Sequence, residues 1–220
     1  MVESRRTSGA LDRNRLRVVD GGAAAPAPQQ SDSDLIDAFE RGEGHACEQL
    51  YDRLIGVVEG TLWKVLGRRD EAHDDLVQAA FEQIVLTLQK RRFARACSLA
   101  SWASSVTTHI AFNVLRSRTR ERRVVDRGRD GSHEANSKSA WTDIEREASA
   151  RQMLHRVRSH LAEMNKNYAT TLFLHDVMGH ELSEIAVLTD VSVAAAQSRL
   201  VRARKELRRR LTSDLNGDEG

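Results

Sequence analysis

The stretch that decides the fold runs from Glu181 to Arg210 and reads ELSEIAVLTDVSVAAAQSRLVRARKELRRR. A short apolar period at its start predicts one helix, residues 189–191 interrupt that period, and Ser192 is well placed to cap a second helix. The apolar residues of the second helix recur at steps of three or four. They are Val193, Ala196, Leu200, Ala203, Leu207 and Leu211. The pattern predicts a helix-turn-helix whose second helix is the longer one.

The opposite face of the second predicted helix is small and polar at its start and basic toward its end. It consists of Ala194, Ala195, Ser198, Arg202, Lys205 and Arg209, with Gln197 and Arg199 at its edges. Such a surface fits the major groove of DNA, with the basic residues beside phosphates. The segment alone leaves open an ordinary solvated basic helix in a bundle, because short helix-turn-helix patterns also occur by chance.

The composition favours an all-α protein. The 220 residues include only two prolines and 5% aromatic residues, and apolar residues recur at helical spacing along most of the chain. The charge is distributed unevenly: residues 31–89 hold 13 acidic and 5 basic side chains, whereas residues 116–129 hold 7 arginines and 2 acidic side chains. An acidic surface binds DNA poorly and suits a protein partner, so the first half of the chain is expected to bind protein.

The cysteines and the hydropathy indicate where the protein works. Cys47 and Cys97 stand alone, so we expect neither a disulfide framework nor a zinc site, and a reducing cytoplasm is the simplest location. No window reaches the apolar length of a membrane span, and the N-terminus lacks the apolar core of a signal peptide. We therefore expect a soluble cytoplasmic protein without a cofactor and without membrane insertion.

Periodicity and composition divide the chain into five parts. Residues 1–30 contain the run GGAAAPAPQQ and are predicted to be a disordered tail, because this composition cannot bury enough surface. Residues 31–118 are predicted to form a domain of about four helices, and residues 119–147 a flexible linker. Residues 148–212 form a second helical domain that ends in the helix-turn-helix, and residues 213–220 a second tail. The predicted fold is all-α, with two small helical domains joined by a flexible linker.

The predicted helix over residues 71–89, EAHDDLVQAAFEQIVLTLQ, has two distinct faces. The apolar face, which should point to the core, carries Val77, Ala80, Phe81, Ile84 and Leu88. The opposite face carries Asp75, Gln78, Glu82, Gln83 and Leu86. An apolar side chain surrounded by polar ones suits a protein interface, and it equally suits a solvated face with one exposed leucine. The helix alone does not decide between these two interpretations.

The next segment, residues 93–118, reads FARACSLASWASSVTTHIAFNVLRSR and also predicts an amphipathic helix. A buried stripe can form from Leu99, Trp102, Val106, Ile110 and Leu115. The far face offers Ser101, Ser105, Thr108, His109, Asn113 and Arg116. Side chains of these types can contact nucleotide bases and phosphates, particularly those of single strands. An ordinary amphipathic helix is the alternative for this segment taken alone.

These three segments, in this order and at these separations, resemble the extracytoplasmic-function class of bacterial sigma factors. The resemblance covers most of residues 33–211 and rests on DDLVQAAF, SLASWASSVTTHIAFNVLRSR and HDVMGHELSEIAVLTDVSVAAAQSRLVRARKELRR. It implies a protein that binds core RNA polymerase, recognises and melts promoter DNA, and so directs promoter-specific transcription initiation. The implied partners are core polymerase, promoter DNA and an anti-sigma factor.

By this resemblance, the helix that contains DLVQ docks on the clamp helices of the largest polymerase subunit. The residues implied in core binding are Asp75, Gln78, Phe81, Glu82 and Leu86. Ala79 departs from the pattern of the family, in which an acidic residue frequently follows the glutamine. One polar contact to the polymerase is therefore expected to be missing or moved.

The second segment resembles the promoter-melting region of the family, which meets the minus-ten element through the loop at residues 95–99 and the helix after it. The implied DNA contacts are Ser98, Thr108, His109, Asn113 and Arg116. Thr108 and His109 replace an Arg-Asn pair that is frequent there, so the resemblance does not carry over a base preference.

The helix-turn-helix resembles the domain that reads the minus-thirty-five element and contacts the flap of the second-largest polymerase subunit. The implied DNA contacts are Ser192, Val193, Ala195, Gln197, Ser198, Arg199 and Arg202. By the same resemblance, the linker would thread between the two promoter-binding domains near the RNA exit path.

Two other classes of protein are alternatives. A stand-alone helix-turn-helix regulator would explain the C-terminal segment but would leave the first domain without a task. A metal enzyme could be inferred from HDVMGHE at residues 175–181, but Gly179 interrupts this run, and a spacing of five places His175 and His180 on different helix faces. We therefore expect no enzymatic activity.

Overall fold

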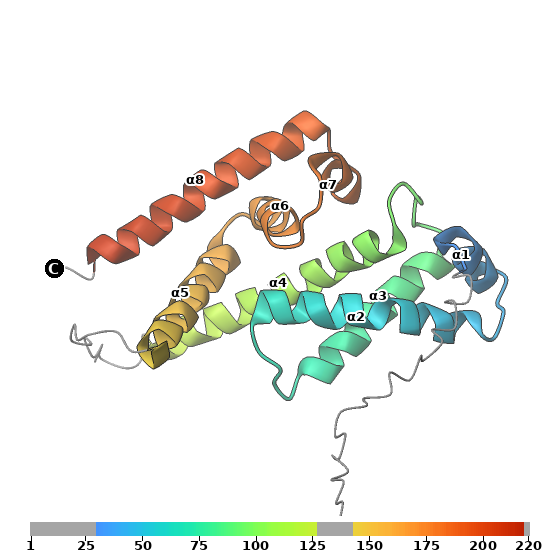
Figure 1. The fold of residues 1–220 in the computed structure, drawn as a ribbon, viewed down its shortest axis with the longest axis horizontal. Helices are drawn as coiled ribbons and strands as arrows, with labels where there is room; N and C mark the ends of the chain where they lie inside the picture. The colour runs from blue at the N-terminus through green and yellow to red at the C-terminus, as the bar shows by residue number, and fades with distance from the viewer. Residues whose placement is uncertain (1–29, 127–142, 218–220) are drawn as a thin grey trace, which may run out of the picture. The chain divides into compact units, whose positions relative to one another are not determined.

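The computed structural model describes residues 30–126 and 143–217, which form eight α-helices and no strand (Figure 1). The first four helices are α1 (Asp32–Glu40), α2 (Ala46–Leu66), α3 (His73–Gln89) and α4 (Leu99–Asp126). The next four are α5 (Asp143–Glu163), α6 (Lys166–Asp176), α7 (Leu182–Leu188) and α8 (Val193–Gly217). The all-α prediction is confirmed, including four helices in the first half and a helix-turn-helix made by α7 and α8.

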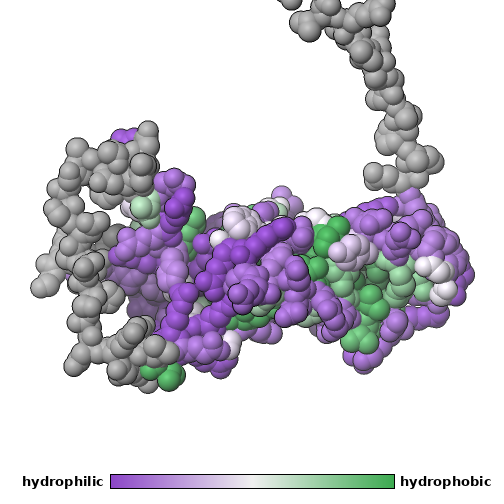
Figure 2. Space-filling model, turned by 90° about the horizontal axis from the view of Figure 1, so that it is seen from below, coloured by the Kyte–Doolittle hydropathy of each residue, from purple (hydrophilic) through white to green (hydrophobic). Residues whose placement is uncertain are grey.

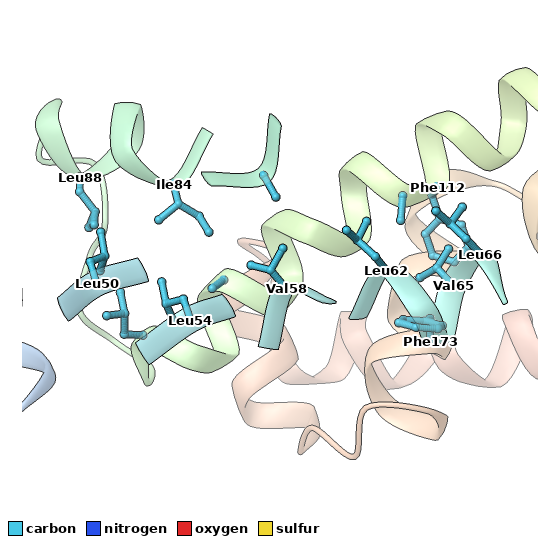
Figure 3. Packing of buried hydrophobic residues seen from close by; sticks show 14 of the residues in the cluster. Leu50, Leu54, Val58, Leu62, Val65, Leu66, Ile84, Leu88, Phe112 and Phe173 are labelled. Atoms are coloured by element: carbon cyan, nitrogen blue, oxygen red, sulfur yellow. The ribbon is translucent and has the colours of Figure 1, made fainter. Parts of the chain in front are cut away.

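α2 is the central helix of the first four. It packs most extensively on α4 and also packs on α1 and α3. Its buried apolar residues include a row at four-residue spacing: Leu50, Leu54, Val58, Leu62 and Leu66. Figure 3 shows residues of this row with Ile84 and Leu88 of α3 and Phe112 of α4. Burial of each such side chain contributes about 1.5–3 kcal/mol, so this row is a main source of cohesion among the three helices.

The end of α2 joins the two halves of the sequence. Gly67 caps the helix with a φ of +73°, a left-handed conformation that glycine adopts without a steric penalty. The guanidinium group of Arg158, from α5, fills the space beside it, since a Cβ at Gly67 would lie 2.3 Å from the Arg158 Cζ. Arg158 Nε also donates to the carbonyl of Val65 at 3.1 Å. The positive φ therefore favours glycine at this turn, and a larger residue would also displace the Arg158 guanidinium.

The last three helices pack on one another, with α8 against both α6 and α7. A small core forms between them from Leu174, Ile185, Ala186 and Ala196. Other buried residues of this half, among them Phe173 and Leu200, belong to the cluster that contains the core of α2 to α4. The Phe173 ring meets the Phe112 ring edge-on, with 5.6 Å between centroids (Figure 3). The two helical halves of the sequence thus share a continuous apolar core.

Some helices are longer than the sequence periodicity predicts. α4 continues to Asp126 and α5 already begins at Asp143, although residues 119–147 are predicted as linker. α8 continues to Gly217, although a tail is predicted from residue 213. The reason is that arginine and glutamate are good helix formers even where no apolar period is present. The predicted tail at residues 1–29, the middle of the predicted linker and residues 218–220 lie outside the described residues, and the division into domains stays a prediction.

Within residues 30–126 and 143–217, every helix falls short of the combination of length and apolar character that crossing a membrane requires.

Candidate nucleic-acid interface

The outward face of α3 is arranged as the sequence predicts. Asp75, Gln78 and Glu82 are exposed, and Leu86 among them has 46% of its surface exposed. Gln78 Nε2 donates to Glu82 Oε1 at 2.9 Å, which orders part of the polar rim. Figure 2 shows apolar side chains reaching the surface among polar ones in the part of the molecule that contains α2 and α3. This face has the composition of a protein interface, with an apolar side chain inside a polar rim.

Phe81 differs from the other four residues implied in core binding. It is only partly exposed and packs against the core, and its ring centroid lies 4.7 Å from that of Tyr51 on α2. Tyr51 is itself 47% exposed. Phe81 therefore supports an aromatic surface next to the polar face, with Tyr51 as the more accessible ring. The sequence analysis missed Tyr51, because its contact with Phe81 joins two helices.

The side of α4 expected to face solvent is in part covered by the second half of the chain. Ser104 Oγ lies 2.9 Å from His180 Nε2, and Phe112 packs on Phe173. Thr108 lies between them at four-residue spacing, is fully buried, and donates through Oγ1 to the carbonyl of Ser104 at 2.7 Å. The expectation that Thr108 is outward-facing is thus wrong for this structure, because its small side chain lies in the row that packs on α6 and the loop after it.

A polar cluster completes this contact between the halves. His180 Nδ1 lies 2.8 Å from a carboxylate oxygen of Glu184, and that carboxylate also accepts a hydrogen bond from the side chain of Ser101. Burial acts to raise the pKa of Glu184, but the hydrogen bonds from Ser101 and His180 outweigh it and lower the pKa. The carboxylate is therefore held ionised by the Ser101 hydroxyl of α4 and the ring of His180.

Three of the predicted minus-ten contacts lie farther along α4. His109 is half-buried, and its pKa is lowered by burial and then by the positive charges of Lys166 and Arg116. Asn113 is exposed. The Arg116 guanidinium lies 5.6 Å from the centroid of the Phe112 ring, and burial lowers its pKa. These residues form a polar surface with one charged group, Arg116, and it is accessible in part.

The loop before α4 is tied to α1 by ion pairs that the sequence analysis did not foresee. Arg95 adopts a φ of +55° and contacts Asp37 at 2.6 Å and Glu40 at 3.1 Å. The backbone N–H of Leu99 donates to Asp32 at 2.9 Å. Ser98, the predicted DNA contact in this loop, is exposed and its Oγ accepts the N–H of Ser101 at 3.0 Å. The acidic turns of α1 thus hold the loop in place, and the run of acids in residues 32–40 is the signal that could have indicated it.

The helix-turn-helix has the geometry that the sequence predicts. The turn places Asp190 at a φ of +51°, and Ser192 Oγ accepts the N–H of Ala195 at 3.2 Å at the start of α8. The predicted contact residues that are exposed are Ser192, Val193, Gln197, Ser198 and Arg202, while Ala195 and Arg199 are half-buried. Val193 departs from the predicted apolar stripe, since 48% of its surface is exposed. It lies in the first turn of α8, before the helix reaches the core.

Two arginines of α8, Arg204 and Arg210, form ion pairs within the protein. Arg204 donates to Asp176 at 3.0 Å, and this hydrogen bond lowers the pKa of Asp176. Arg210 donates to Glu163 at 3.1 Å and to Glu206 at 2.8 Å. The exposed residues Arg202, Lys205 and Arg209 lie on the other face of the helix. The basic character of α8 therefore serves both packing and an outward surface.

The histidines of the HDVMGHE run make separate contacts. His175 Nδ1 lies 2.8 Å from Asp176, whereas His180 contacts Ser104 and Glu184. In the part of the chain that the structure describes, no group of three His, Cys, Asp or Glu side chains is positioned to hold a metal ion.

Comparison with known proteins gives a match for each half of the chain. The family model described as Sigma-70 region 2 matches residues 50–121, and the one described as Sigma-70, region 4 matches residues 154–207. Together these matches cover more than half of the chain and include the three surfaces described above. No functionally curated protein matches the sequence closely enough to serve as a relative.

Two solved structures are similar to this chain. One, described as CnrH in complex with the cytosolic domain of CnrY, has 23% sequence identity and a TM-score of 0.51, and the match covers 84% of this chain and 99% of that one. The other, described as the sigma factor RpoE in complex with the anti-sigma factor NepR from Bartonella quintana, has 16% identity and a TM-score of 0.43, with 77% and 99% covered. The likeness to the first concerns the fold alone.

Proposed function

The chain belongs to the sigma-70 family, and we propose that it is a sigma factor of the extracytoplasmic-function class whose helices divide the work as follows. A sigma factor of this kind binds core RNA polymerase and directs promoter-specific transcription initiation. The observation that carries the proposal is the presence of both regions, in order, in one chain. A stand-alone helix-turn-helix regulator accounts only for the second region, so this alternative is not favoured.

In our proposal, α3 binds core polymerase through Asp75, Gln78, Glu82 and Leu86. An exposed leucine within a polar rim supports this assignment, because interface anchors have this arrangement. Phe81 contributes by supporting Tyr51. The docking surface is the clamp helices of the largest subunit, and the flap of the second-largest subunit receives the second domain.

Promoter DNA is assigned to two further surfaces. The loop around Ser98 and the α4 residues His109, Asn113 and Arg116 contact the minus-ten element, with Thr108 joining them only once the second half of the chain has moved away. The outward face of α8 contacts the minus-thirty-five element, and Arg199 and Arg202 bind phosphates there. The chain acts by binding and positioning and carries out no bond chemistry of its own. Its place of action is beside the polymerase, in the cytoplasm.

An anti-sigma factor is the proposed regulator. CnrH, which has the same fold, is described in complex with the cytosolic domain of CnrY. The family resemblance suggests a partner of that kind for this chain.

Run-off transcription with purified core polymerase tests the proposal. We expect transcripts from a subset of genomic fragments only when the chain is added, and their start sites would give the promoter motif. A chain that binds promoter DNA tightly by itself, fails to bind core polymerase and gives no transcript would contradict the proposal and favour the stand-alone regulator.

A further inference from the structure

A pocket with mostly basic walls lies between α4 and the end of α5. Three arginines and an asparagine of α4 line it at steps of three and four, so they share one helix face: Asn113, Arg116, Arg120 and Arg123. Thr119 adds a hydroxyl group on the α4 side, and Glu163 of α5 lies on the opposite side. The residues therefore come from both halves of the sequence.

The pocket carries more positive charge than its own carboxylate neutralises. Glu163 forms ion pairs with Arg123 and also with Arg210, which lies 3.1 Å away, so two guanidinium groups share it. Among the described residues, Arg120 has no ion-pair partner. The pocket thus retains an excess of positive charge even after the ion pairs within it are counted.

Arg116 supplies an unused donor. Its Nη2 atom is shielded from solvent and has no hydrogen-bond partner among residues 30–126 and 143–217. A buried charged donor without a partner is unfavourable, which makes a ligand with an acceptor oxygen favourable there. The effect of this charge extends to His109, whose pKa is lowered by burial and by the charges of Lys166 and Arg116.

We propose that this pocket binds a phosphate group, held by Arg116 and Arg120, with the side-chain amide of Asn113 as a further donor, since the Thr119 hydroxyl already donates to the carbonyl of Leu115. A phosphate is the preferred ligand because arginine donates paired N–H groups that match its oxygens. Glu163, on the α5 side, is paired with Arg123 and Arg210, so Arg116 and Arg120 are the arginines left to bind an anion.

The phosphate can come from a free phosphorylated anion or from the backbone of a nucleic acid. This site goes beyond the proposed function, because its occupation needs neither polymerase nor a promoter. Arg116 and Asn113 belong also to the proposed promoter surface, so a free anion and promoter DNA would compete for them. Anion binding and transcription are therefore measured separately, and a negative result for one hypothesis leaves the other standing.

Calorimetric titration of the full chain with pyrophosphate tests the site. We expect saturable binding that becomes about tenfold weaker in Arg120→Glu, since each charge-assisted hydrogen bond to the anion is worth about that factor or more. Arg116→Ala should weaken binding similarly. Arg41→Glu is the matched control, because Arg41 is exposed beside Glu43 and lies outside the pocket, and the substitution changes the net charge by the same amount as Arg120→Glu.

Two results would overturn the proposal. One is the absence of saturable binding to the native chain, and the other is equal weakening in Arg120→Glu and Arg41→Glu, which would indicate attraction by net charge alone. A second arm identifies the source of the phosphate. If saturating pyrophosphate weakens binding of a short single-stranded DNA, the backbone uses this pocket, and if DNA binding is unchanged, the pocket is specific for the small anion.

Discussion

At the scale of single residues, the most informative side chains are apolar ones that remain exposed to solvent, although their burial would stabilise an isolated domain. Leu86 is such a residue, because its neighbours on α3 are polar and nothing among the described residues covers it fully. Apolar anchors inside a polar rim often carry much of the binding energy of an interface.

Leu86→Glu should therefore weaken binding to core polymerase by about tenfold or more, because it places a charge where an apolar contact is expected. Surface plasmon resonance with immobilised core polymerase measures this. Val124→Glu is the control, since Val124 is 72% exposed near the end of α4 and lies outside the proposed polymerase surface. Equal affinities of the two variants would contradict the role of Leu86.

His109 makes stability depend on pH. Burial, Lys166 and Arg116 lower its pKa, so between its ordinary value of about 6.5 and the lower value in the folded chain, only the unfolded chain takes up the proton. The free energy of unfolding should fall as pH drops below about 6.5, and this fall should be smaller in His109→Gln.

Urea unfolding at about pH 7.5 and about pH 5.5 checks this expectation. His45→Gln, at an exposed position before α2, serves as the control. An unaltered pH dependence in His109→Gln would show that other groups are responsible.

At the scale of helices, α8 separates its packing and its outward functions by face. Arg202 is exposed and makes a long hydrogen bond of 3.5 Å to the Tyr168 hydroxyl, whereas Arg204, two residues away, is paired with the carboxylate of Asp176. Replacing either arginine by alanine removes one positive charge from α8, so the two variants differ only in which face loses the charge.

Arg202→Ala should weaken binding of the polymerase-bound chain to promoter DNA and reduce the slope of log affinity against log salt by about one, because one phosphate contact is lost. Fluorescence anisotropy over a range of salt concentrations measures both quantities. Arg204→Ala should leave the slope unchanged. A lower slope in Arg204→Ala alone would reverse the assignment of the two faces.

The contact of α4 with the loop between α6 and α7 is the second feature at this scale. His180→Ala removes the partner of both Ser104 and Glu184, and we expect it to weaken this contact by about 1–2 kcal/mol. Faster amide hydrogen exchange in α7 and in the first turns of α4 would reveal the loosening.

His175→Ala is the matched control, because His175 contacts Asp176 and Arg204 in the same region but not α4. If both substitutions accelerate exchange in α4 equally, the hydrogen bond to Ser104 does not hold the halves together.

At the scale of the whole molecule, the proposed function predicts that the packing of α6 on α4 opens on a promoter. The two promoter elements are separated by about 25 base pairs, or about 80 Å of DNA, whereas the Phe112 and Phe173 rings lie 5.6 Å apart. If one chain reads both elements as proposed, we expect its two halves to separate first.

Spin labels at Cys47 and at Arg209→Cys, in a chain with Cys97→Ser, would follow this separation. Both labelled positions are exposed. The distance between the labels, measured by double electron–electron resonance, should change when core polymerase is added to the free chain. An unchanged distance would mean that the packed arrangement persists on the polymerase.

The sequence predicts the helices, their faces and the helix-turn-helix, because apolar spacing and capping residues are local signals. Ser192 and Asp190 are examples, since their roles depend on adjacent residues. It does not predict that Thr108 is buried or that Arg95 is bonded to α1, because both depend on segments far away in the chain. Periodicity identifies a polar face but does not identify what covers it.

The shared core around Phe112 and Phe173 also bears on how affinities of this protein should be interpreted. If only about one free chain in a hundred has its halves apart, its apparent affinity for polymerase is about a hundredfold below that of the separated form. A substitution that loosens this core would then appear as tighter polymerase binding, although it touches no residue of the polymerase. Gains in affinity at positions far from α3 are thus a measure of how rarely the free chain opens.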